Sequence, residues 1–96
     1  MAVKPIKNMS QSLEELLRHL GLETKIKRCR VVELWPQIVG DKISEVTCAE
    51  RVTGQTLHVR VKSMTWKTEL IFHKRDILSR IDRVVGSDVV KEIRFF

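Results

Sequence analysis

The sequence predicts an α+β domain in which helices pack on one face of a three-stranded sheet. The first observation is a strict alternation over residues 57–62, where Leu57, Val59 and Val61 share one parity, as in a strand with one buried and one wet face. The second is apolar spacing typical of helices in two stretches before this strand and one after it. The third is a turn and two further strand-like segments. The predicted order is helix, helix, strand, strand, helix, strand.

The first helix is predicted between a mobile tail, residues 1–9, and Gly21. Ser12 and Glu15 have the spacing of a capping box at its start. Its apolar stripe is expected to face the core and contains Leu13, Leu16, Leu17 and Leu20. Residues 10–96 are therefore interpreted as one domain that follows the tail.

A second helix is predicted to begin around Glu23 and to end at Gly40. Pro36 cannot donate to the helix ladder, so a kink or a restart is expected there. The buried seam before Pro36 is expected at four positions, Leu22, Ile26, Cys29 and Val32. Around and after Pro36 the apolar face continues with Trp35, Ile38 and Val39.

A looser alternation over residues 43–52 predicts the first strand, with a possible bulge near Glu50. Its buried parity is expected at Val46, Cys48 and Val52. Residues 53–55 contain Gly54 and form a turn, because glycine supplies the positive φ that hairpin loops often need. The first two strands are therefore predicted to form an antiparallel hairpin.

One long helix is predicted from Thr65, its N-cap, to Val85. His73 lies at the edge of its apolar stripe and is expected to be packed and hydrogen-bonded. The stripe is broad and contains Trp66, Leu70, Ile77, Ile81 and Val84. The last strand is predicted over residues 88–96. Its inward residues are expected to be Val89, Ile93 and Phe95, and its outward residues Val90, Glu92, Arg94 and Phe96.

The bulk composition indicates a small globular protein with a polyanionic partner. The 96 residues are 43% hydrophobic and 31% charged, with a net charge of +6 and an isoelectric point near 9.8, which favours nucleic acid as the partner. No apolar run is long enough for a membrane span, and the N-terminus lacks a secretory signal, so we expect a cytoplasmic protein without a membrane partner. Cys29 and Cys48 stand far apart, which is typical of two buried thiols rather than a disulfide or a zinc site.

No constellation of catalytic residues stands out. The histidines are scattered, the four glycines stand singly, and no His, Cys, Asp and Glu cluster has metal-ligand spacing. We therefore predict a non-enzymatic binding module with no cofactor, no metal and no small-molecule substrate.

The candidate phosphate contacts lie mainly on the outward face of the 57–62 strand. His58, Arg60 and Lys62 alternate there, and no Asp or Glu occurs between Arg51 and Thr68, so an all-cationic face is expected. Lys67 and Arg94 are expected to extend this surface. A second basic cluster in the second helix includes Lys25 and Arg28, for which a solvated helix surface is an equally good interpretation.

Two aromatic residues are candidate partner contacts. Phe72 lies opposite the apolar stripe among cations, where it is either a partner anchor, a base-stacking group or an ordinary exposed apolar residue. Trp66 is favoured as a core residue, with base stacking as the alternative.

The sequence resembles a known family, the DciA-like domain, formerly a bacterial domain of unknown function. The resemblance covers about residues 12–96. It depends on motifs that occur in the family's order: Trp35 with Ile38-Val39-Gly40, Ile43 and Thr47, the alternating stretch Leu57 to Ser63, Trp66 with Glu69-Leu70, Ile77-Leu78, Ile81, Val85-Gly86, and Val90 with Ile93-Arg94-Phe95.

The resemblance implies a K-homology-like fold and a role in DNA replication. Members of the family load or operate the replicative helicase and bind single-stranded DNA, so both are expected partners. The sequence lacks the GxxG loop with which RNA-binding K-homology domains clamp the backbone.

Two other functions stay open at this point. One is a small K-homology-like module that binds structured RNA. The other is a protein–protein adaptor without nucleic-acid binding, anchored by Phe72, Phe96 and the leucine-rich first helix.

Overall fold

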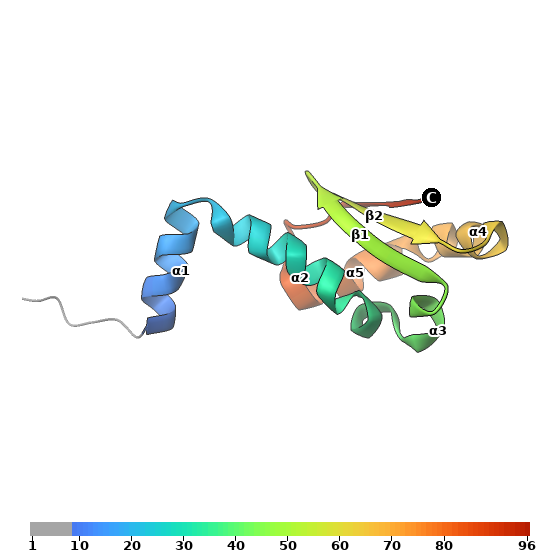
Figure 1. Ribbon diagram of the computed structural model, residues 1–96, viewed down its shortest axis with the longest axis horizontal. Coiled ribbons are helices and arrows are strands. Elements are labelled where there is room, and N and C mark those ends of the chain that lie inside the picture. The colour runs from blue at the N-terminus through green and yellow to red at the C-terminus, as the bar shows by residue number, and fades with distance from the viewer. Residues whose placement is uncertain (1–8) are drawn as a thin grey trace, which may run out of the picture.

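The computed structural model describes residues 9–96, and the side chains of residues 12–16 and 18–96 (Figure 1). The predicted α+β class is confirmed: five helices and a three-stranded sheet make up this part of the chain. The elements in chain order are α1 (Met9–His19), α2 (Leu22–Val39), α3 (Asp41–Ser44), β1 (Thr47–Thr53), β2 (Thr56–Val61), α4 (Met64–Phe72), α5 (Lys74–Val85) and β3 (Glu92–Phe95). The likeness to a K-homology fold stays a prediction.

The sheet has the order β1-β2-β3. β1 and β2 form the predicted antiparallel hairpin, and Gly54 in its turn has the positive φ, 62°, that the sequence led us to expect. β3 pairs with β2 in parallel. Helices α2, α4 and α5 all contact the sheet, and in Figure 1 α2 and α5 lie below it. One face of the sheet is therefore covered and the other is open.

The predicted bulge in β1 is confirmed, but the predicted parity of its first half is wrong. The register shifts between Ala49 and Arg51, so Glu50 is the extra residue. Before the bulge, Thr47 and Ala49 point into the core, and Cys48 is exposed. After the bulge, Val52 packs against the core, as predicted.

The core lies between the covered face of the sheet and helices α2, α4 and α5. Trp35 is 2% exposed, and its indole Nε1 donates to Thr47 Oγ1 at 2.9 Å. Thr47 Oγ1 in turn donates to the Ile43 carbonyl at 2.7 Å, so both buried polar groups are satisfied. The other fully buried large side chains are Leu57, Leu70, Ile77, Ile81, Ile93, Val31, Val59 and Val90.

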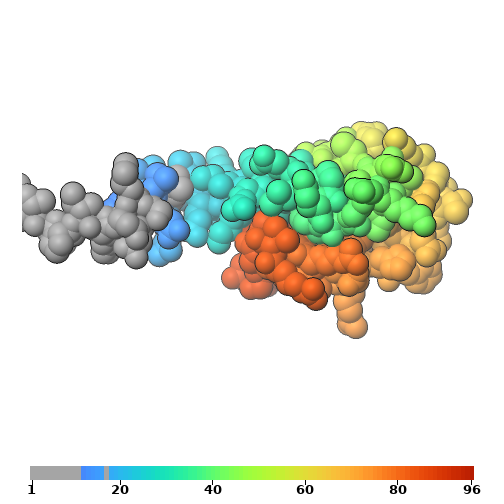
Figure 2. All heavy atoms as spheres, turned by 90° about the horizontal axis from the view of Figure 1, so that it is seen from below, coloured from blue at the N-terminus to red at the C-terminus, as the bar shows by residue number. Residues whose placement is uncertain are grey.

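Helix α1 does not join this core, which corrects the prediction that its leucine stripe is buried at Leu13, Leu16 and Leu20; the side chain of Leu17 lies outside the described residues. Among the described elements, α1 contacts α2 alone. Leu13, Leu16 and Leu20 are each more than half exposed. Figure 2 shows α1 beyond the end of the body formed by the later elements. Ser12 lies inside α1 and is not its N-cap, and residues 1–8 of the predicted tail lie outside the described residues.

The predicted seam of α2 is also wrong over the first half of the helix. Leu22, Ile26 and Cys29 are exposed, because this half extends past the sheet toward α1. The buried residues are Val31, Trp35, Ile38 and Val39. The helix is continuous through Pro36, so no restart occurs there, and it ends at Gly40, as predicted.

The single long helix predicted over residues 65–85 is two helices, α4 and α5, that meet at His73. His73 is exposed rather than packed, and its Nε2 lies 3.4 Å from Glu69 Oε1. The N-cap of α4 is Ser63, not Thr65: Ser63 Oγ accepts a hydrogen bond from the Trp66 backbone N–H at 3.2 Å. The break lets α4 follow the sheet while α5 packs against α2.

The last strand is shorter than predicted, because it begins at Glu92 and runs to Phe95. Ile93 and Phe95 point inward and Arg94 points outward, as predicted. Val90 is 1% exposed and so belongs to the core, contrary to its predicted outward position. Within residues 9–96, no helix combines the length and the apolar character that a membrane span requires.

Candidate nucleic-acid interface

The open face of the sheet presents a row of three basic side chains. Strand pairing places Arg51 opposite His58 in the hairpin, and His58 opposite Arg94 in the parallel pair. Directly opposite residues of neighbouring strands project from the same face, with Cβ atoms about 5 Å apart. Arg51 and Arg94 are exposed and His58 is half-buried between them. The row crosses the full width of the sheet.

A second row lies beside the first and contains Arg60. Its strand partner in β1 is the exposed Cys48. On the other side, Phe96 extends the β3 ladder, because its N–H donates to the Val59 carbonyl and its carbonyl accepts from the Val61 N–H. The Arg60 guanidinium carbon lies 5.0 Å from the centre of the Phe96 ring, within cation–π range. We call these two rows the outer sheet face: Cys48, Arg51, His58, Arg60, Arg94 and Phe96.

The expectation of a face without acid is wrong at Glu50. The bulge places the Glu50 carboxylate beside the outer sheet face, where its Oε2 accepts from Arg60 Nε at 2.9 Å. Its other oxygen lies 3.8 Å from Arg51 Nη1. The hydrogen bond from Arg60 lowers the pKa of Glu50, and the same contact raises the pKa of Arg60. Arg60 is therefore already paired in the absence of a ligand, although both side chains remain accessible to water.

Lys62 and Lys67 lie near one end of this surface. Lys62 follows β2 directly, is exposed, and continues the ladder by donating from its N–H to the Val46 carbonyl at 2.9 Å. By alternation it shares the parity of Arg60. Lys67 lies on α4 rather than on the sheet and is half-buried.

The two candidate phosphate contacts on α2, Arg28 and Lys25, differ in their position relative to the outer sheet face. Arg28 lines a hollow of about 270 Å³ together with Glu50 and Arg51, so it borders the outer sheet face. Its Nε is buried and has no hydrogen-bond partner among the described residues. Lys25 is exposed on the part of α2 that extends away from the sheet, and nothing brings it to the same surface.

Sequence reasoning missed Arg51 and the role of Glu50. The predicted parity, with Val46, Cys48 and Val52 buried, gives Arg51 its observed outward face, but Arg51 was not named among the candidate contacts. The same parity gives Cys48 the wrong face, because it does not count the extra residue of the bulge. A carboxylate that interrupts an otherwise regular strand is the signal that marks the bulge. The register counted from the turn at Gly54 places Arg51 opposite His58, and the bulge at Glu50 shifts only the pairing of the residues before it.

The two aromatic candidates lie away from the outer sheet face. Trp66 is half-buried, packs against the core, and lines a hollow of about 470 Å³ between α3, α4 and α5 with Ile43, Leu70 and His73. This agrees with its favoured interpretation as a core residue. Phe72 is 80% exposed at the end of α4 and lines another hollow with Arg75 and Ser79.

The described part of the chain holds no group of three or more His, Cys, Asp or Glu side chains arranged to bind a metal ion. Cys29 and Cys48 are both free thiols and both exposed, contrary to the expectation that they are buried. The chemistry that the outer sheet face offers is that of cations and one aromatic ring, which suits phosphate and base contacts.

Comparison with known proteins points to one family. The profile of the family described as "Dna[CI] antecedent, DciA" matches residues 8–95. A UPF0232 protein of Corynebacterium glutamicum (strain R) is 28% identical over 94 residues, which are 98% of this chain and 53% of that protein. A UPF0232 protein of Mycobacterium tuberculosis (strain ATCC 25618 / H37Rv) is 26% identical over 86 residues, 90% of this chain and 46% of that protein.

A third relative is a UPF0232 protein of Rhodococcus jostii (strain RHA1), 29% identical over 79 residues, 82% of this chain and 42% of that protein. The chain thus spans about half the length of the curated relatives it matches. The family profile covers nearly all of the chain and includes every described strand and the helices that form the core. The chain therefore belongs to the DciA family.

Proposed function

We propose that this DciA domain is a non-enzymatic accessory of bacterial DNA replication that binds single-stranded DNA on its outer sheet face. The row of Arg51, His58 and Arg94 carries the proposal, because it displays basic side chains across a rigid three-stranded support. Arg60 and Lys62 extend the cationic surface along β2. Such a surface binds polyphosphate mainly through the release of condensed counterions.

The aromatic ring of Phe96 supports a single-stranded ligand over a duplex. The ring is 39% exposed and lies against the Arg60 guanidinium, so a base can stack on this pair. Stacking requires an accessible base face, which a single strand presents and a duplex does not.

The test is binding of a fluorescently labelled DNA single strand over a range of salt concentrations. Two double variants each remove two cations from the proposed surface: Arg60→Ala with Lys62→Ala, and Arg51→Ala with Arg94→Ala. Each should make the slope of log K against log salt shallower by roughly 1.4, about 0.7 per phosphate contact. The matched control is Lys42→Ala with Arg83→Ala, which removes two exposed cations from α3 and α5. Equal slopes for all three variants would exclude the outer sheet face as the binding surface.

The expected protein partner is the replicative helicase. Family membership supports this partner. Mixing the purified chain with the purified helicase of the same bacterium, with and without single-stranded DNA, tests it by size-exclusion chromatography. Absence of a complex under both conditions contradicts a helicase role for this domain alone.

RNA is the alternative nucleic-acid ligand. Competition between DNA and RNA single strands of matched sequence separates the two, because the 2′-hydroxyl is the group that distinguishes them. Preference for RNA would replace replication by an RNA-binding function on the same surface.

A protein-adaptor function is a second candidate, favoured by the exposed apolar side chains. Leu13, Leu16 and Leu20 on α1 and Phe72 on α4 are all more than half exposed. A helicase complex that survives high salt and forms without nucleic acid would favour this function, because apolar contacts are not screened by salt.

A further inference from the structure

Strand β3 has a free edge. It pairs with β2 alone, and no other strand of residues 9–96 lies beside it. The N–H and carbonyl groups of Phe96 bond to β2, and in a parallel ladder the residues that bond to one neighbour alternate. The backbone N–H and carbonyl groups of Ile93 and Phe95 therefore point away from β2, toward this edge.

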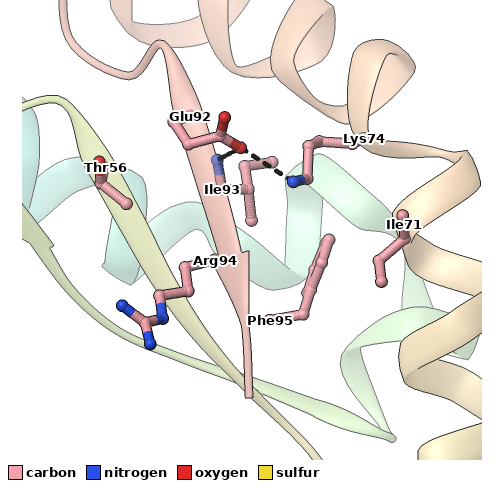
Figure 3. Close-up of a pocket in the computed structure, with 7 residues that line it drawn as sticks. All are labelled: Thr56, Ile71, Lys74, Glu92, Ile93, Arg94 and Phe95. Carbon is pink, nitrogen blue, oxygen red and sulfur yellow. Dashed lines mark hydrogen bonds and ion pairs between the residues drawn. The ribbon is translucent and has the colours of Figure 1, made fainter.

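The free edge opens on a hollow of about 410 Å³ between β3 and the junction of α4 and α5 (Figure 3). Arg94 and Phe95 project to opposite sides of the strand, and Ile71 lies on the Phe95 side. Ile71 is 49% exposed and also lines the neighbouring hollow around Phe72. The edge thus adjoins an exposed apolar patch.

One side chain, Glu92, protects the edge in the free protein. Its Oε1 accepts from the Ile93 N–H and lies 2.9 Å from Lys74 Nζ, as the dashed lines of Figure 3 mark. The hydrogen bond from Lys74 is the largest cause that lowers the pKa of Glu92, and the hydrogen bond from the Ile93 N–H lowers it further. A charged side chain folded onto an outward N–H is a common way to keep an edge strand from pairing with another chain.

We propose that an acidic, extended peptide segment of a partner protein adds to β3 as a fourth strand of the sheet. The Glu92 carboxylate already shows the chemistry of this ligand: an oxygen at the Ile93 N–H and a negative charge at Lys74. A peptide carbonyl replaces the first contact and an acidic side chain the second. The added strand also satisfies the outward backbone groups of Phe95.

The charges around the edge select an acidic peptide over a basic one. Lys74 and Arg75 lie at the start of α5, and Arg94 lies on the open side of β3. Glu92 is the one carboxylate lining the β3 hollow, and the half-buried Asp82 lines the neighbouring hollow. Asp76, in the first turn of α5, is paired with Arg80. Side chains of an added strand alternate between two faces. Apolar residues are expected on the Ile71 and Phe72 side and acidic residues on the Arg94 side.

This inference does not rest on the nucleic-acid proposal, because its central contacts are backbone groups and Lys74. The probe is a capped peptide of about seven alternating glutamate and valine residues, long enough to cover a typical strand. Its binding to the intact chain is followed by two-dimensional amide NMR and by hydrogen exchange of the Phe95 N–H. A dissociation constant of the order of 100 µM is expected, with slowed exchange at Phe95.

Two N-methylated versions of the peptide provide the matched control. Alternate N–H groups of a strand point to the same side, so methylation of one alternate set removes the donors that face β3, and methylation of the other set leaves them intact. One version should lose about ten-fold or more in affinity and the other little. The corresponding lysine–valine peptide should bind much more weakly than the glutamate–valine peptide.

Three results would overturn the proposal. The first is no binding of the glutamate–valine peptide up to about 1 mM. The second is binding that is equally affected by both methylation patterns or that leaves Phe95 exchange unchanged, because the peptide is then held by charge elsewhere. The third is concentration-dependent protection of Phe95 without peptide, which would assign the edge to a second copy of this chain. Binding of single-stranded DNA by the Lys74→Ala variant should be unchanged, so this test and that of the outer sheet face fail independently.

Discussion

Arg60 on β2 donates a hydrogen bond to Glu50 on β1, with 2.9 Å between Nε and Oε2. The contact exists because the bulge inserts Glu50 into β1 beside the outer sheet face. A phosphate that binds Arg60 therefore competes with a carboxylate that is already present. On the proposed function, Glu50 is expected to moderate the affinity of the cationic surface for anions.

Glu50→Gln should raise the affinity for single-stranded DNA about three- to ten-fold and steepen the salt dependence by roughly 0.7, because Arg60 is then free to bind a phosphate. Asp76→Asn is the matched control, since Asp76 forms a comparable exposed ion pair with Arg80 on α5, at 3.0 Å. Fluorescence anisotropy at several salt concentrations measures both effects. Equal gains for the two variants would show that only net charge matters.

Thr47→Val should destabilise the fold by about 1–3 kcal/mol, because it leaves the buried Trp35 N–H without an acceptor. Thr47→Ser keeps the hydroxyl and should retain most of the stability. Urea denaturation followed by tryptophan fluorescence gives the free energy of unfolding. If Val and Ser cost the same, the loss belongs to packing and the hydrogen bond contributes nothing.

Ser63→Ala should cost about 0.5–2 kcal/mol of stability, the usual range for removal of an N-cap. Its hydroxyl accepts from the Trp66 N–H, whereas Thr65 lies within the first turn of α4. Thr65→Ala should therefore change the free energy of unfolding by no more than about 0.5 kcal/mol. The reverse ranking in a denaturation series would reassign the cap to Thr65.

Gln substitutions at the exposed leucines of α1, Leu13, Leu16 and Leu20, should change the free energy of unfolding by less than about 0.5 kcal/mol each, because these side chains lie outside the core. Leu70→Ala, at a site that is fully buried, should cost about 2–5 kcal/mol. Urea denaturation of a triple variant with all three Gln substitutions, and of Leu70→Ala, provides the comparison. A loss in the triple variant as large as that for Leu70 would mean that α1 packs on the body in solution.

The Glu92 contact should make stability depend on pH. Because Lys74 and the Ile93 N–H hold the pKa of Glu92 below its ordinary value of 4.5, the contact stabilises the fold at higher pH. This contribution is lost as the pH falls from that value through the lower pKa of the folded state. In denaturation curves between pH 7 and about pH 3, the stability of Glu92→Gln should fall less steeply than that of wild type. A parallel fall in both proteins would show that the contact is not formed in solution.

Alternation and helical spacing located most of the secondary structure of the body. The hairpin, its glycine turn, the bulge and the inward positions Leu57, Val59, Ile93 and Phe95 follow from local patterns and were confirmed. Prediction failed where a local pattern has more than one tertiary outcome. The apolar spacing from Trp66 to Val84 does not show that the helix breaks at His73, because a break that keeps both halves on the core preserves the pattern.

The outer sheet face was partly predictable, because alternation along a strand is a local pattern. Arg60, Lys62, His58 and Arg94 have the outward parity that their strands predict. Arg51 has the outward parity of its predicted strand but was not named as part of this surface. Glu50 interrupts the predicted alternation, and its place beside Arg60 depends on the inserted residue of the bulge. Local patterns also give no contact between strands, so the register that aligns Arg51, His58 and Arg94 was not available from the sequence.

The sequence alone determined the α+β class, the hairpin, the basic character of β2 and the resemblance to the DciA family, since these depend on residue types at short spacings. Only the tertiary structure decided which apolar stripes are buried, which acid lies beside Arg60, and that β3 has a free edge. The physical reason is that a side chain's period along the chain is local, whereas burial and charge pairing depend on segments that are distant in the sequence. The exposed leucines of α1 and the Glu50–Arg60 pair are the clearest cases.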